Sequence, residues 1–83
     1  MTILPMFQSF LYWAQGQRTR RDSVGLIVNA ILEDAQFPKS QNLDYQKGYI
    51  NQCEVGHVDA YSNIPGGGAM RAFEKAWTEF SNV

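Results

Sequence analysis

The sequence predicts an all-α fold, a compact bundle of four to five short helices. Apolar side chains recur at helical spacing in several separate segments, and no segment shows the alternation typical of a half-buried strand. The chain has 83 residues, of which 45% are hydrophobic and 13% are aromatic. This composition is sufficient for one hydrophobic core, whereas the length is too small for two. Residues 1–83 are therefore expected to form a single helical domain.

The first helix is expected to run from Pro5 to about Gln17, because the fixed φ angle of proline suits the first turn of a helix. Gly16 and the polar residues after it favour an end at this point. The side chains that recur at i, i+3, i+4 and i+7 are expected to face the core. They are Phe10, Trp13, Ala14 and Gln17.

The second helix has a start signal and a stop signal. Asp22 or Ser23 can accept hydrogen bonds from the free backbone N–H groups of a first helical turn. Phe37 precedes Pro38, and a residue in that position avoids the helical conformation. Between these signals, five apolar residues share one helical face: Val24, Ile27, Val28, Ile31 and Ala35.

The second half of the chain has a weak helical pattern, a break and a strong helical pattern. A helix is expected over residues 43–53, with Tyr45, Tyr49 and Cys53 on its inner face. Residues 55–68 are rich in glycine and proline and predict a long loop, of a length typical of mobile or functional segments. The last helix is expected over residues 69–80, with Trp77 as the main core anchor.

Several landmarks occur together in a recognisable order. Asp-x-Val-Gly at Asp22 to Gly25 leads into an apolar helix that ends in Asp-x-x-Phe-Pro at Asp34 to Pro38. Phe-x-x-Ala-Trp follows near the end of the chain, at Phe73 to Trp77. With Phe10 and Trp13 before them, these landmarks resemble the YozE-like family of small bacterial proteins, over about residues 9–80. The resemblance implies a fold similar to the sterile alpha motif (SAM) domain, and it implies no shared catalytic residues.

The chain departs from that family directly after Val24-Gly25. Family members tend to carry polar or charged residues there, whereas residues 26–28 of this chain are Leu, Ile and Val. At roughly 100° per residue, Leu26 and Ala30 point about 200° and 240° away from Val24, on the solvent side of the helix. Apolar residues on that side indicate a contact surface, which the N-terminal aromatic residues Phe7 and Tyr12 would extend. A single exposed leucine is also normal on a protein surface, and this alternative stays open.

No constellation of residues predicts catalysis, a metal site or a cofactor. Cys53 is the only cysteine and His57 the only histidine, so neither a four-ligand zinc site nor a Ser-His-Asp triad is expected. Gly66, Gly67 and Gly68 precede a helix, but the Lys-Ser/Thr of a phosphate-binding loop does not follow them. The absence of disulfide pairs, of a signal peptide and of a long apolar stretch favours a cytoplasmic location, with no membrane association.

The charges offer an alternative function. The net charge is -1, which is unlike the balance of a typical DNA-binding domain. One basic cluster nevertheless exists, at Arg18, Arg20 and Arg21, and Lys39 and Lys47 would widen it into a nucleic-acid-binding surface. The structural alternative is a solvated turn between two helices in which Asp22 pairs with one of the arginines.

The function expected from the sequence is therefore non-enzymatic binding of another protein. The candidate partner-binding residues are Leu26, Ala30, Tyr12 and Phe7. SAM-like domains can self-associate, so a second copy of the chain is also a candidate partner. Small acidic proteins of this kind are common on phages and plasmids, where some inhibit host nucleic-acid enzymes, including CRISPR effectors. A host enzyme is accordingly a third candidate, although no residue identifies one.

Overall fold

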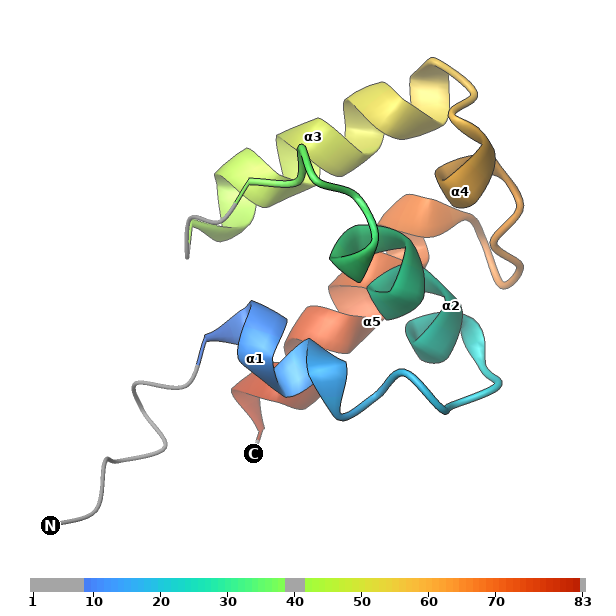
Figure 1. The fold of residues 1–83 in the computed structure, drawn as a ribbon. Coiled ribbons are helices and arrows are strands. Elements are labelled where there is room, and N and C mark those ends of the chain that lie inside the picture. The colour runs from blue at the N-terminus through green and yellow to red at the C-terminus, as the bar shows by residue number, and fades with distance from the viewer. Residues whose placement is uncertain (1–8, 39–41, 83) are drawn as a thin grey trace, which may run out of the picture.

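The computed structural model describes residues 9–38 and 42–82. These residues form α1 (Phe10–Gln15), α2 (Ser23–Leu32), α3 (Leu43–Val55), α4 (Asp59–Ser62) and α5 (Ala69–Ser81). The described ranges contain no strand, so the predicted all-α bundle is confirmed. Helix α5 lies in the middle, where α1, α2 and α3 all pack against it (Figure 1). None of the helices in these ranges is long and apolar enough to cross a membrane.

A polar side chain caps the start of each of the first three helices. Ser9, Asp22 and Asn42 each accept a hydrogen bond from the backbone N–H three residues later, at 3.0, 3.0 and 2.9 Å. The cap at Asp22 is one of the two that the sequence predicts. The cap at Ser9 corrects the first helix: Ser9 is extended, so α1 begins at Phe10 and does not continue from Pro5, which lies outside the described residues.

The inner face of α2 is buried as predicted, with one exception. Val24, Ile27, Val28 and Ile31 are buried, whereas Ala35 is exposed. The helix ends at Leu32, and the chain then turns, with the Phe37 N–H bonded to the Asp34 carbonyl at 3.1 Å. This turn brings the Phe37 ring into the core in place of Ala35.

The aromatic part of the core is centred on Phe10. This side chain is fully buried, and its ring lies 4.8 Å from Trp77, 5.5 Å from Phe73 and 5.6 Å from Phe80, centroid to centroid. Trp77 packs against Phe10, Phe73 and Phe80 and so belongs to this core as predicted, although it is only partly buried. The reason is that one side of Trp77 lines a surface hollow with Leu43 of α3.

Helix α3 turns inward a face that matches the predicted one in part, because Cys53 is buried and Tyr49 packs against the core as expected. Gln46, Ile50 and Cys53 are buried, and Tyr45 is exposed. Burial of Gln46 is possible because both ends of its amide have partners. The amide nitrogen donates to the Pro38 carbonyl at 3.3 Å, and the amide oxygen accepts from the Trp77 indole at 3.2 Å.

The segment predicted as a long loop contains α4, so the prediction of an unstructured residue range 55–68 is wrong. Tyr61 and Ile64 are buried, and Val58 precedes the first residue of the helix. Tyr61 lies within the helix and Ile64 follows its end, and both side chains enter the core, whereas Val58 stays exposed. The glycines that follow have positive φ angles, 80°, 107° and 96° at residues 66–68, and they form the turn into α5.

Candidate functional site

A groove of about 520 Å³ lies where α2, α3 and α4 meet. Its apolar lining comes from two helices, with Leu26 and Ala30 on α2 and Val58 and Ala60 at α4. Leu26 is 43% exposed and Val58 is 45% exposed. The structure therefore places the predicted contact residues Leu26 and Ala30 together on a surface, and it adds two aliphatic residues that the sequence did not indicate.

The polar part of the groove is built around Asp34. One carboxylate oxygen, Oδ2, accepts hydrogen bonds from the hydroxyl groups of Tyr49 at 2.6 Å and Tyr61 at 2.9 Å. The other oxygen, Oδ1, accepts the backbone N–H of Gln36 at 2.9 Å. Three separate segments are thereby joined at one carboxylate.

This arrangement fixes the protonation states of the cluster. Burial of Asp34 opposes its ionisation, but the hydrogen bonds from Tyr49, the Gln36 N–H and Tyr61 outweigh that effect and lower its pKa. The bond to Asp34 raises the pKa of Tyr49, and burial together with the same carboxylate raises the pKa of Tyr61. At neutral pH, Asp34 is therefore ionised and both phenols keep their protons.

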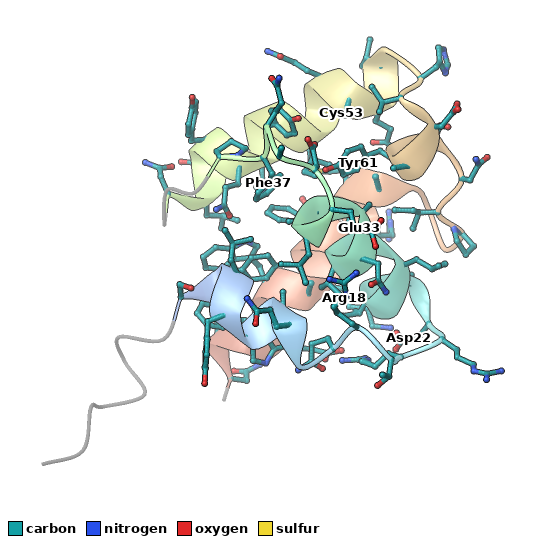
Figure 2. The ribbon with its side chains drawn as sticks, viewed as in Figure 1. Arg18, Asp22, Glu33, Phe37, Cys53 and Tyr61 are labelled. Carbon is teal, nitrogen blue, oxygen red and sulfur yellow. The ribbon has the colours of Figure 1, made fainter. Side chains whose placement is uncertain are left out.

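Cys53 also lines the groove, near Tyr61 and Glu33 on the same side of the bundle (Figure 2). Its thiol is free and buried, and burial raises its pKa, so it remains protonated and is a weak nucleophile at neutral pH. His57 is exposed at the end of α3. Among residues 9–38 and 42–82, no group of three or more potential metal ligands comes together.

Tyr12, the other predicted contact residue that the structure describes, does not extend this groove. Tyr12 is 63% exposed, but it lines a separate hollow beside Trp13 and Gly16 on α1. Phe7 lies outside the described residues. The structure thus divides the described part of the predicted surface, with Leu26 and Ala30 in the groove and Tyr12 outside it.

Two of the three clustered arginines are held by carboxylates. Arg18 pairs with Glu33 at 2.8 Å and also donates to the Asn29 side chain (Figure 2). Arg20 pairs with Asp22 and Glu79, both at 2.6 Å, and so connects the loop before α2 to α5. These contacts match the structural alternative, in which Asp22 pairs with an arginine between two helices.

The other basic candidates that the structure describes, Arg21 and Lys47, differ in their contacts. Arg21 is exposed and forms no ion pair with a described residue, and Lys47 pairs with Glu74 at 3.2 Å. Lys39 lies outside the described residues. The N-terminus of α5 already has an anion of this chain, since the Glu54 carboxylate accepts the Ala69 N–H at 2.9 Å.

The sequence did not indicate Asp34, Val58, Ala60 or Tyr61 as groove residues. Val58, Tyr61 and Ile64 follow one another at intervals of three residues, which is the spacing of one side of a helical turn. That signal could have identified α4 within the predicted loop. No local signal links Asp34 to Tyr61, because the two residues are 27 positions apart.

Comparisons with known proteins add no further information about the site. The chain matches no protein-family model, no curated protein and no solved structure.

Proposed function

We propose that the protein is a non-enzymatic interaction module that binds another protein through the groove between α2, α3 and α4. The observation that carries the proposal is that Leu26 and Val58, on different elements, expose aliphatic side chains into one groove. Apolar side chains from two elements that line one groove favour an interaction site, whereas scattered single residues do not.

The polar groups of the groove support binding better than they support catalysis. The Asp34 carboxylate has a lowered pKa and accepts three hydrogen bonds, so it is a weak general base at neutral pH. The Cys53 thiol has a raised pKa and is a weak nucleophile. Their hydrogen bonds and burial instead stiffen the groove, which reduces the entropy lost on binding.

The finer predictions from the sequence belong to this proposal. They are a YozE-like module with SAM-like topology, located in the cytoplasm. A second copy of the chain or a host nucleic-acid enzyme is the candidate partner. The five-helix bundle is compatible with each of them, and the groove would serve either kind of partner.

The proposal is tested by capturing the tagged protein with its partners from its native cell, before and after nuclease treatment. We expect a protein that remains bound after nuclease and is lost with Leu26→Lys, because the substitution places a charge on the apolar rim. Leu43→Lys is the matched control: Leu43 is 36% exposed and lines a different hollow, so binding is expected to persist.

Circular dichroism melts of both variants show whether the fold is kept, which is expected since both side chains are substantially exposed. Retention of the partner by Leu26→Lys would contradict the proposal. Release of the captured partner by nuclease would favour the alternative, which is nucleic-acid binding at Arg18, Arg20 and Arg21. Gel-shift affinity that falls steeply between two salt concentrations would then support that alternative.

A further inference from the structure

We infer that the groove accepts a segment of the partner protein in which one lysine side chain is flanked by apolar side chains. The inference rests on the proposed docking function and specifies the chemistry of the partner. Two features of the groove carry it: a carboxylate without a counter-ion among residues 9–38 and 42–82, and the apolar rim around that carboxylate.

The carboxylate without a counter-ion is that of Asp34. Of the two carboxylates that line the groove, Glu33 is paired with Arg18 at 2.8 Å. Asp34 forms no ion pair with any residue of the described ranges, and all of its hydrogen bonds come from neutral donors. No described lysine or arginine lines the groove. The groove therefore presents one negative charge that its own side chains do not neutralise.

The hydrogen bonds of Asp34 favour lysine over arginine as the incoming cation. An ionised carboxylate has about four lone-pair sites, two on each oxygen. The two tyrosine hydroxyls use both sites of Oδ2, and the Gln36 N–H uses one site of Oδ1. One site on Oδ1 remains. A lysine ammonium needs a single acceptor, whereas a bidentate guanidinium needs an open site on each oxygen.

The rim supplies the second half of the complementarity. Leu26 and Ala30 approach the groove from α2, and Val58 and Ala60 approach it from α4. Apolar side chains that flank the incoming lysine would cover this rim and remove water from it. Removal of water lowers the local dielectric constant and strengthens the attraction between the ammonium group and the Asp34 carboxylate.

The test uses short fluorescein-labelled peptides that share the same leucine and alanine positions and differ at one central residue, which is Lys, Arg, norleucine or Glu. Fluorescence anisotropy gives the affinity, and amide NMR shifts of the labelled protein identify the site. We expect the lysine peptides to shift the amide NMR signals of Leu26, Ala30 and Val58. Norleucine peptides are expected to bind about tenfold more weakly, because they lose a charged hydrogen bond. Arginine peptides should not bind more tightly than the lysine peptides.

Two substitutions at the rim keep the test independent of the folding of the Asp34 cluster. Leu26→Lys and Leu26→Glu both remove the apolar contact, but only the introduced lysine repels the incoming ammonium group. Leu26→Lys should therefore weaken the binding of the lysine peptides more than Leu26→Glu does. The inference would be overturned if lysine and norleucine peptides bind equally well, or if glutamate peptides bind more tightly. It would also be overturned if no peptide shifts the amide NMR signals of the groove residues. The proposed docking function would then still stand if the captured partner is lost with Leu26→Lys and kept with Leu43→Lys.

Discussion

The two sides of the bundle are held together by different interactions. Where α1 meets α5, four aromatic rings contact one another at centroid distances from 4.8 to 5.8 Å: Phe10, Trp13, Trp77 and Phe80. Where α2, α3 and α4 meet, a carboxylate and two phenols replace much of that packing, and aliphatic side chains remain exposed. The aromatic side is the one expected to supply most of the stability. The groove side is ordered by polar contacts and keeps apolar surface available for binding.

The largest effect is expected on the aromatic side, for Phe10→Ala. The ring is fully buried and contacts three rings of α5, so its removal leaves a cavity and should destabilise the fold by about 3–5 kcal/mol. Urea denaturation followed by circular dichroism measures this change in the free energy of unfolding. Tyr12→Ala is the control on the same helix, with an expected change within about 0.5 kcal/mol. Similar losses of unfolding free energy in the two variants would show that the aromatic side does not supply most of the stability.

A smaller effect is expected on the groove side, for Tyr61→Phe. The substitution removes a hydrogen bond to an ionised carboxylate, which is expected to cost about 1.5–3 kcal/mol at neutral pH. Tyr45→Phe, at an exposed position of α3, should leave stability nearly unchanged.

The same variant has a defined pH dependence. The pKa of Asp34 is lowered in the folded state, so the stabilisation is fully present above its ordinary value near 3.8 and is lost as the pH falls through the folded pKa. The difference in thermal midpoint between the wild type and Tyr61→Phe should therefore shrink below about pH 4. A difference that is constant from neutral pH to pH 2 would show that Asp34 does not receive this bond in its ionised form.

The smallest effect is expected at the edge of the groove side, for His57→Gly. His57 has a φ angle of 57°, directly after α3, where the Val58 N–H bonds to the Cys53 carbonyl at 3.0 Å. Glycine adopts this left-handed conformation without steric cost, although it also loses more entropy on folding, so a net gain of about 0.5 kcal/mol is expected. Thermal denaturation measures this gain in stability, and His57→Ala is the control because alanine keeps the steric strain of the positive φ angle. A less stable His57→Gly variant would contradict the claim that the positive φ angle strains the turn at His57.

Most of the fold could be predicted from the sequence because local signals determine it. The cap at Asp22 and the spacing of Val24, Ile27 and Val28 define α2, and α5 follows from the same kind of spacing. Helix α4 could not be recognised in this way. It has four residues, about one turn, and Gly56 before it and Pro65 and Gly66 after it favour a loop.

The candidate site was predictable only where a single helix determines it. The angular positions of Leu26 and Ala30 on α2 predict that both face away from the core. Leu26 is indeed exposed, whereas Ala30 is partly buried and packs against the core, so the prediction is wrong for Ala30. The cluster of Asp34, Tyr49 and Tyr61 depends on three segments that only the tertiary packing brings together, across 15 and 27 positions of the chain. The inner face of α3 was predicted only in part for a related reason, because the partners that allow Gln46 to be buried lie on other elements.

The most direct test of the central claim is methyl NMR of the labelled protein, recorded alone and with its captured partner. If the groove is the docking surface, the methyl signals of Leu26, Ala30, Val58 and Ala60 will shift or broaden. Those of Leu43, which lies outside the groove, will stay in place. Unchanged groove signals in the presence of a bound partner, or shifts confined to Leu43, would contradict the account.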